Sequence, residues 1–172
     1  MREARGGGTE QVRVSPRWTS LFAAGLAVLA ADQATKAIIR STLAPGQGID
    51  ISGPLSIQHL QNPGIAGGGL AGNAVVLALV ATAAVVGILG FLAYHGAARP
   101  IVLIGFGLLI GGGLSNLLDR LWLGYVTDFL LRSNEVFNLA DVAIFLGGVL
   151  VLAALVALIP QALSRYQPRS GG

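Results

Sequence analysis

Two aspartates are the residues whose type and position most clearly allow chemistry. Asp128 lies in the sequence Val-Thr-Asp-Phe-Leu at 126–130, and Asp141 opens the last apolar run of the chain. The segment between them can fold back, so the two carboxyl groups can meet. Two carboxyl groups in a site of low dielectric do not both ionise easily, so one holds a proton while the other stays charged. Such a pair provides a general acid and a general base, which can activate water against a peptide carbonyl.

Asp141 also has a structural interpretation. Asn138 lies three residues before it and is a suitable helix N-cap. A carboxylate in the first turn of a helix also interacts favourably with the positive end of the helix dipole. The spacing by itself favours capping, and the capping and catalytic interpretations are compatible.

The segment 111–120 combines three consecutive glycines with polar residues at the end of an apolar run. Glycines in such a run indicate close packing between helices. Asn116 and Asp119 are three residues apart on one helix face, and Arg120 follows them. Arg120 can pair with a carboxylate or hold a lipid phosphate. Alternatively, it anchors the helix end by extending its charged group to the lipid headgroups.

Two further polar motifs precede this segment. Asp32 and Lys36 are four residues apart with the acid first, which is the favourable order for an ion pair on a helix. We expect a structural pair that faces the other helices, and a direct catalytic role is the alternative. The sequence Asn-Pro-Gly at 62–64 forms a turn, or the amide of Asn62 binds a peptide backbone.

The composition points to a membrane protein. Hydrophobic residues make up 53% of the 172 residues and charged residues 11%, with a mean hydropathy of +0.72. Soluble domains carry roughly 25% charged residues, so a soluble domain is excluded, and the apolar content also excludes a disordered chain. The absence of cysteine excludes disulfides, and we expect no metal and no cofactor. The net charge of +3 comes from basic residues at the ends of apolar runs, which indicates membrane orientation rather than nucleic-acid binding.

Four apolar runs predict four transmembrane helices, since a helix needs about 20 apolar residues to cross a bilayer. The runs lie at 18–39, 74–93, 101–118 and 142–159. The first run is interrupted by Asp32 and Lys36. A cleaved signal peptide is the alternative for this run, because the small residues Ala30 and Ala31 follow an apolar core. The apolar pattern continues beyond them, which favours an uncleaved helix.

The distribution of charge predicts the orientation. Four spans place both termini on one side, and that side carries seven of the eleven basic residues, so we expect it to be cytoplasmic. Six of the eight acidic residues lie at or near the outer face. Alternation of apolar and polar residues at 49–51 and 55–57 predicts short strands outside the membrane. We expect cytoplasmic tails at 1–16 and 161–172, and a membrane domain at 17–160 with outer segments at about 41–70 and 119–140.

In this order, and on four spans, the polar motifs resemble those of the lipoprotein signal peptidase (signal peptidase II) family. The similarity covers roughly 18–160, which is nearly the whole chain outside the tails. Each motif is weak alone, and together they are specific. They stand at 32–36, 62–64, 111–120, 126–129 and 137–141.

The resemblance implies an all-α membrane protein with four transmembrane helices and a small extracytoplasmic β-rich cradle on the membrane surface. It implies an aspartic endopeptidase of the bacterial inner membrane, with its active site near the outer face. The substrate would be a prolipoprotein that carries diacylglyceryl on its cysteine, and cleavage just before that cysteine would release the signal peptide. The implied partners are these prolipoproteins, membrane lipids and inhibitors of the globomycin type, and no cofactor is implied.

The resemblance also implies roles for individual residues. Asp128 and Asp141 would form the catalytic pair. The residues that bind substrate or support the pair would be Asn62, Asn116, Arg120 and Asn138. The residues with mainly structural weight would be Asp32, Lys36 and Asp119.

Two positions depart from the family pattern. Gly67 stands where the family usually has Phe after its asparagine-glycine motif, and Ser115 stands where it usually has Gly before Asn116. These changes bear on substrate fit more than on chemistry, because both aspartates and Arg120 are intact. They leave open a catalytically silent relative that binds prolipoproteins without cutting them.

A small proton-coupled transporter with four helices is an alternative from another class. Asp32 would then be its intramembrane proton or cation site. Such a transporter needs little structure outside the membrane, whereas about 30 residues separate the first two spans here. It also gives no reason for acidic motifs at 128 and 141, so the sequence favours the peptidase.

Overall fold

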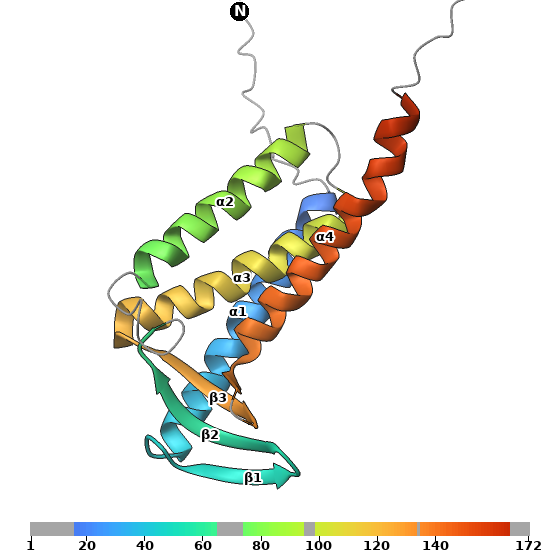
Figure 1. Ribbon diagram of the computed structural model, residues 1–172. Coiled ribbons are helices and arrows are strands. Elements are labelled where there is room, and N and C mark those ends of the chain that lie inside the picture. The colour runs from blue at the N-terminus through green and yellow to red at the C-terminus, as the bar shows by residue number, and fades with distance from the viewer. Residues whose placement is uncertain (1–15, 65–73, 95–98, 134, 166–172) are drawn as a thin grey trace, which may run out of the picture.

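The apolar runs of the chain form long helices, and the segments between them form strands. The computed structural model describes residues 16–64, 74–94, 99–133 and 135–165. In chain order the elements are α1 (Pro16–Thr42), β1 (Gly48–Ser52), β2 (Leu55–Asn62), α2 (Ala74–Tyr94), α3 (Pro100–Leu123), β3 (Val126–Arg132), β4 (Glu135–Phe137) and α4 (Leu139–Arg165). Along the chain, β1 and β2 therefore follow α1, and β3 and β4 follow α3 (Figure 1).

α3 is the central helix, since it packs against α1, α2 and α4. The buried core at this packing centre consists of Leu21, Val102, Leu103, Phe106 and Val151. Many large apolar side chains on the outer helix faces remain exposed, such as Leu26 at 65% and Phe145 at 70%. Apolar surface of this extent is unusual for a protein in water and suits contact with lipid tails.

The close approach of α3 to its neighbours depends on glycine. A Cβ atom on Gly112 would lie 2.6 Å from the backbone oxygen of Ala140 in α4. A Cβ atom on Gly111 would collide with the backbone of Gly25 in α1. No side chain fits into contacts this short, so the predicted role of the glycine run in close helix packing is confirmed.

Three helical segments are long and apolar enough to cross a membrane, namely Trp18–Thr42, Pro100–Leu123 and Leu139–Ala157. In α2 the apolar segment found within the described residues is shorter, at Leu79–Gly90. The chain is thus mostly helical with three candidate spans, and the predicted count of four spans is not confirmed. α1 runs without a break past Ala31, so the predicted continuation of the first helix is confirmed.

The four strands form one antiparallel sheet in the order β1-β2-β3-β4. The two strands predicted from alternation are present as β1 and β2, which pair through Ile49 and Ile57. β3 comes from the second connecting segment and pairs with β2 so that Asp128 lies opposite Leu60. The sheet therefore joins the two connecting segments and carries one of the two candidate aspartates.

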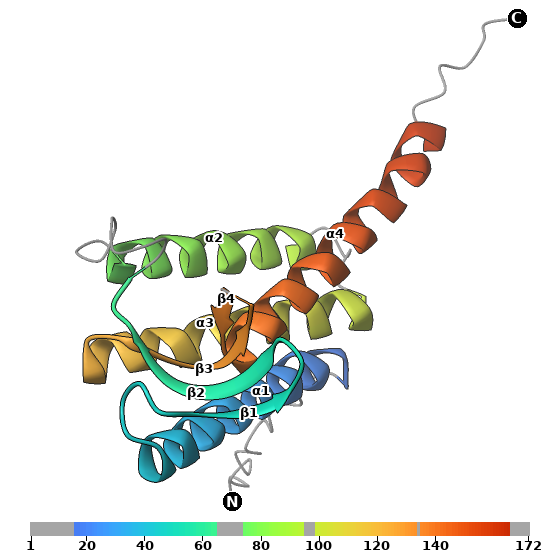
Figure 2. The ribbon, with the colours of Figure 1, turned by 60° about the horizontal axis from the view of Figure 1, so that its bottom comes forward.

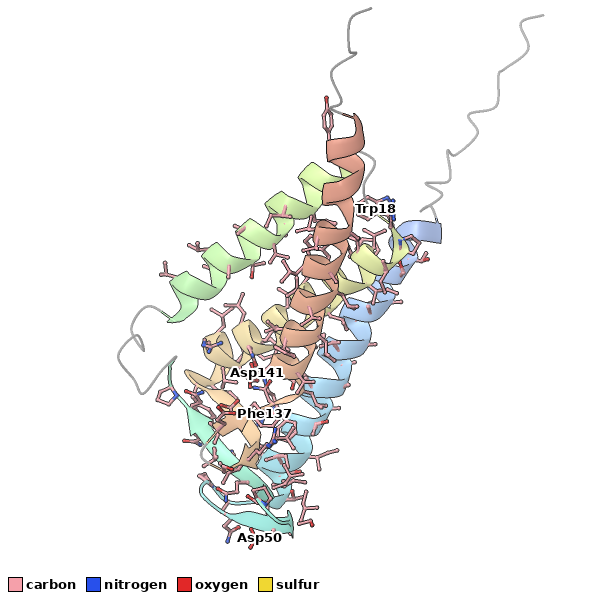
Figure 3. All side chains as sticks on the ribbon, turned by 45° about the vertical axis from the view of Figure 1, so that its right-hand side comes forward. Trp18, Asp50, Phe137 and Asp141 are labelled. Carbon is pink, nitrogen blue, oxygen red and sulfur yellow. The ribbon has the colours of Figure 1, made fainter. Side chains whose placement is uncertain are left out.

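The sheet lies at one end of the helical bundle, against α1 and α3 (Figures 1 and 2). Trp18, near the start of α1, lies toward the opposite end, and Asp50 of β1 lies at the far edge of the sheet (Figure 3). α3 ends at Gly124, which has a left-handed φ of 79° and donates its N–H to the backbone oxygen of Arg120. This turn leads directly into β3, so the end of α3 and the start of β3 lie together where the bundle meets the sheet.

Candidate active site

The start of α4 is fixed by a reciprocal cap. Asn138 precedes the helix, and its Oδ1 accepts a hydrogen bond of 3.0 Å from the backbone N–H of Asp141. In return, Oδ2 of Asp141 accepts a bond of 3.2 Å from the backbone N–H of Asn138. The predicted capping is thus confirmed. The cap also holds the carboxyl of Asp141 where the helices meet the sheet (Figure 3).

Asp128 is held by two asparagines from different elements. Asn138 donates from Nδ2 to Oδ1 of Asp128 at 2.7 Å, and Asn62 donates from Nδ2 to Oδ2 at 2.9 Å. Oδ1 of Asn62 also accepts the backbone N–H of Gly64 at 3.1 Å. Asn62 therefore closes the predicted turn and also binds a carboxylate, a contact that the sequence analysis did not predict. Asn138 contacts both aspartates, which brings the two acids into one site.

Burial raises the pKa of the Asp128 carboxyl above its usual value of 3.8. Only 1% of this residue is exposed, and removal from water disfavours the charged form. The donors Asn62 and Asn138 act in the opposite direction, as do the charges of Lys36 and Arg120, but they offset burial only in part. Asp128 therefore keeps its proton to a higher pH than an ordinary aspartate does.

Asp141 is half-buried and lies on the wall of a cavity of about 280 Å³ between α2, α3 and α4. Asn116 of α3 donates from Nδ2 to Oδ1 of Asp141 at 2.8 Å. The polar lining includes Asn116, Arg120 and Asp141, and the remaining lining includes the apolar side chains of Val85 and Ile144. The cavity thus has a polar part with a carboxylate and an apolar part between the helices.

A buried charge cluster lies next to this site. Lys36 of α1 is 2.8 Å from Oδ2 of Asp32 and 3.1 Å from Oδ2 of Asp119, and all three side chains are at most 1% exposed. The predicted ion pair between Asp32 and Lys36 is therefore confirmed. Asp119 also accepts the backbone N–H of Thr127 at 3.0 Å, which ties α3 to β3. Across the described part of the chain, no group of three His, Cys, Asp or Glu side chains could hold a metal ion.

Arg120 faces the cavity rather than an acid. It donates from Nη1 to the backbone oxygen of Asn116 at 3.2 Å, and it forms no ion pair among the described residues. Its Nε is buried and has no acceptor in the same part of the chain. A buried donor without a partner costs free energy, so this atom is available to an acceptor group that enters the cavity.

Ser115 contributes a contact that the sequence interpretation missed. Its Oγ donates to Oδ2 of Asp32 at 2.7 Å and accepts from Nε2 of Gln33 at 3.0 Å. Ser115 is fully buried and faces α1, so its departure from the family pattern bears on helix packing and not on the cavity. A polar residue beside Asp32, such as Gln33, is a signal that could have indicated this contact. Gly67, the other departure, lies outside the described residues.

Comparisons with known proteins identify the family of the chain. Residues 24–157 match the family described as signal peptidase (SPase) II.

The chain belongs to the signal peptidase II family.

Signal peptidase II is a protease family, and its members are membrane proteins with apolar helices. The lipoprotein signal peptidase of Moorella thermoacetica is 40% identical over 128 residues, covering 73% of this chain and 85% of that protein. The lipoprotein signal peptidase of Pelotomaculum thermopropionicum is 38% identical over 139 residues, covering 79% and 91%. The lipoprotein signal peptidase of Brucella ovis is also 38% identical, over 141 residues.

The fold is similar to that of solved membrane enzymes. A bacterial membrane enzyme determined by the in meso method at 2.3 Å resolution superposes with a TM-score of 0.70 at 26% identity, covering 90% of this chain and 94% of that one. A second such enzyme, determined at 1.9 Å, gives a TM-score of 0.61 at 27% identity. Membership of the signal peptidase II family rests on the sequence matches, and the fold is similar to that of these bacterial membrane enzymes.

Proposed function

We propose that the chain is an intramembrane aspartic endopeptidase that removes the signal peptide from diacylglyceryl-modified prolipoproteins, cutting just before the lipidated cysteine. Asp128 and Asp141 form its catalytic pair. The observation that carries this proposal is the position of Asn138, which binds Asp128 through its side chain and caps the helix turn that bears Asp141. A pair held in this way, beside a cavity, suits acid–base catalysis on a bound peptide.

The two carboxyls have different surroundings, and these suggest different roles. Asp128 is only 1% exposed, and we assign it as the acid. Asp141 lies on the cavity wall, where water and substrate can reach it, and the bonds from Asn116 and from the backbone of Asn138 hold its carboxyl in place. We therefore assign it as the base. Asp141 takes a proton from water as the water oxygen attacks the scissile carbonyl carbon, and Asp128 protonates the carbonyl oxygen.

The resulting gem-diol then breaks down. Asp141 returns its proton to the leaving nitrogen as the C–N bond breaks, and one hydroxyl of the gem-diol returns a proton to Asp128. The products are a carboxylic acid on the signal peptide and a free amine on the cysteine, and both aspartates regain their starting states. Because the acids are linked through Asn138, the apparent pKa values of the reaction belong to the pair.

The cavity supports a substrate with one polar and one apolar part. Arg120 and Asn116 provide donors at its polar part, and we assign the free Nε of Arg120 to a carbonyl oxygen of the substrate. The apolar lining from α2, α3 and α4 suits the hydrophobic segment of a signal peptide. Asn62 and Asn138 support the pair rather than the substrate, since both donate to Asp128.

The membrane arrangement completes the proposal. α1, α2, α3 and α4 all span the inner membrane of a bacterial cell, the tails at 1–16 and 161–172 are cytoplasmic, and the sheet is the cradle on the outer surface. Seven of the eleven basic residues would then lie inside, in agreement with the positive-inside rule. The substrate carries its lipid in the outer leaflet. An active site at the outer end of the helices, next to the sheet, can therefore receive both lipid and water.

The transporter alternative finds little support in the surroundings of Asp32. This carboxylate is fully buried and bound to Lys36, Ser115 and the backbone N–H of Ala140 at 3.0 Å. A transported proton must be able to reach the carboxylate that binds it and to leave that carboxylate again. The contacts of Asp32 suit a structural residue instead.

A cleavage assay tests the proposed function. Purified protein in detergent is mixed with a diacylglyceryl-modified prolipoprotein, and the mass of the product is followed with and without globomycin. Asp128→Asn should lower cleavage by about 100-fold or more, because it removes the acid. Asp50→Asn, on the exposed edge strand β1, is the matched control and should cleave normally. Normal cleavage by Asp128→Asn would refute the proposal, and a folded wild type that binds the prolipoprotein without cutting it would indicate the silent relative.

A further inference from the structure

Lys36 uses its ammonium group for more than the ion pair with Asp32. The three donor contacts of Nζ are Oδ2 of Asp32 at 2.8 Å, Oδ2 of Asp119 at 3.1 Å and Oδ1 of Asn116 at 2.8 Å. An ammonium has three protons and no acceptor, so these three contacts use its full capacity. The contact to Asn116 is the one that leads toward the active site.

The contact with Lys36 determines which end of the Asn116 amide faces Asp141. Since Lys36 can only donate, it requires the amide oxygen on its side. Asn138 strengthens this choice, because its Nδ2 donates to the same oxygen at 3.2 Å. The amide nitrogen of Asn116 is thereby turned to Oδ1 of Asp141, at 2.8 Å.

We propose that Lys36 is a positioning residue for the reaction: it holds the amide of Asn116 so that its nitrogen donates to Asp141 and keeps that carboxyl ready to act as the base. This inference rests on the proposed function, since it assigns a role to the same catalytic pair. Lys36 touches neither aspartate of the pair by hydrogen bond among the described residues and acts through Asn116.

The consequence of losing Lys36 follows from the surrounding charges. Without the ammonium, Asp32 and Asp119 are left without their shared cation and attract the amide nitrogen of Asn116. A rotated Asn116 presents its oxygen to Asp141, which disfavours the ionised carboxylate and favours the protonated one. The base would then be available only at higher pH.

Several charged groups surround Asp141. They come from β3 (Asp128), from α1 (Asp32 and Lys36) and from α3 (Asp119 and Arg120), while α2 carries no charged residue. Of these, Lys36 and Arg120 are the cations, and only Lys36 is bonded to the side-chain amide that contacts Asp141. Loss of Lys36 therefore removes both a positive charge and the hydrogen bond that fixes Asn116.

The structure offers a control for a merely structural role. Ser115 links the same two helices beside Asn116, through Asp32 and Gln33, but has no bond to the side-chain amide of Asn116. Ser115→Gly should thus weaken the contact between α1 and α3 without turning Asn116. If Lys36 acts only through stability, its variant should behave like Ser115→Gly, with a lower Tm and an unchanged pH dependence of the rate.

The test compares pH–rate profiles of wild type, Lys36→Met and Ser115→Gly with a diacylglyceryl-modified prolipoprotein in detergent. Lys36→Met should move the acidic limb of the kcat profile upward by about one pH unit. It should also lower kcat near neutral pH by about tenfold, with KM changed less than about twofold. Ser115→Gly should lower the Tm and leave the position of the limb unchanged. A folded Lys36→Met with the wild-type limb would overturn the inference.

Lys36→Met leaves the buried carboxylate of Asp32 without a cation and can fail to fold. The double variant Asp32→Asn with Lys36→Met removes a neutral pair, and Asp119 keeps Arg40 at 3.6 Å. It should show the same upward movement of the limb, and an unmoved limb in this variant also overturns the inference. Full activity of Asp128→Asn would instead remove the proposed function itself, so the two failures are distinguishable.

Discussion

Asn138, which directly precedes α4, donates a hydrogen bond of 2.7 Å to Asp128 of β3, ten positions earlier in the chain. The same side chain caps α4 through its oxygen, at 3.0 Å from the backbone nitrogen of Asp141. One buried amide thus joins the strand that bears the first aspartate to the helix that bears the second. Both ends of this amide are used, so no other orientation satisfies both contacts.

Replacement of Asn138 should separate its two functions. Serine also caps helices well but is too short to reach Asp128, so Asn138→Ser should keep stability within about 1 kcal/mol of wild type while cleavage falls by at least about tenfold. Asn138→Ala should lose both the cap and the activity. Unfolding in denaturant and the cleavage rate are the two measurements. Equal activity of wild type and Asn138→Ser would contradict a role of this amide in catalysis.

The raised pKa of Asp128 predicts how stability depends on pH. Between the usual value of 3.8 and the raised value in the folded state, the folded protein binds more protons than the unfolded chain. The contribution of Asp128 to stability is therefore fully present below the usual value and is lost as the pH rises through the folded value. Asp128→Asn lacks this loss, so its stability relative to wild type should increase across the same window. Unfolding curves at a series of pH values check this, and a constant difference would count against it.

Asn62 should influence the acid of the pair. Its donor to Asp128 lowers the pKa of that carboxyl, so Asn62→Ala should raise the pKa further and move the basic limb of the activity profile to higher pH. We expect activity at neutral pH to fall by about tenfold, because the carboxyl also loses its fixed position. The matched control is Gln61→Ala, the exposed neighbour on β2. A basic limb that stays in place in Asn62→Ala would show that this hydrogen bond does not act on the acid.

The glycine run should respond unevenly to alanine. Gly112→Ala places a methyl group 2.6 Å from the backbone oxygen of Ala140, which forces α3 and α4 apart next to Asp141. Such overpacking costs about 1–3 kcal/mol, so both the Tm and the cleavage rate should fall. Gly113→Ala is the control for the Tm, since the nearest atom, Oγ1 of Thr82, is 3.9 Å away at an ordinary contact distance. Similar Tm values for both variants would argue against tight packing at Gly112.

Features set by short spacing could be predicted from the sequence. The pair Asp32 and Lys36 is four residues apart on one helix, and Asn138 and Asp141 are three residues apart at a helix start, so the geometry of the helix brings each pair together. The strands at 49–51 and 55–57 also followed from alternation, because they form a local hairpin. The length of the apolar runs predicted the helices themselves.

Contacts between distant residues had to come from the tertiary structure. The sequence did not show that Asn62 meets Asp128 across 66 positions, because this depends on the pairing of β2 with β3 from two separate segments. It also related the departure at Ser115 to substrate fit, whereas helix packing turns that side chain to Asp32, 83 positions away.

The sequence by itself thus determined the class of protein, the helices and the two candidate aspartates, because composition and the length of apolar runs are properties of continuous segments. Only the packing of α1, α3 and α4 with the sheet decided which polar atoms surround those acids. Lys36, Asn116 and Asn138 come from three segments, and their partners are chosen by the rule that each buried donor and acceptor must be satisfied. That rule applies to the folded arrangement as a whole, so these partners cannot be predicted from the spacing of residues in one segment.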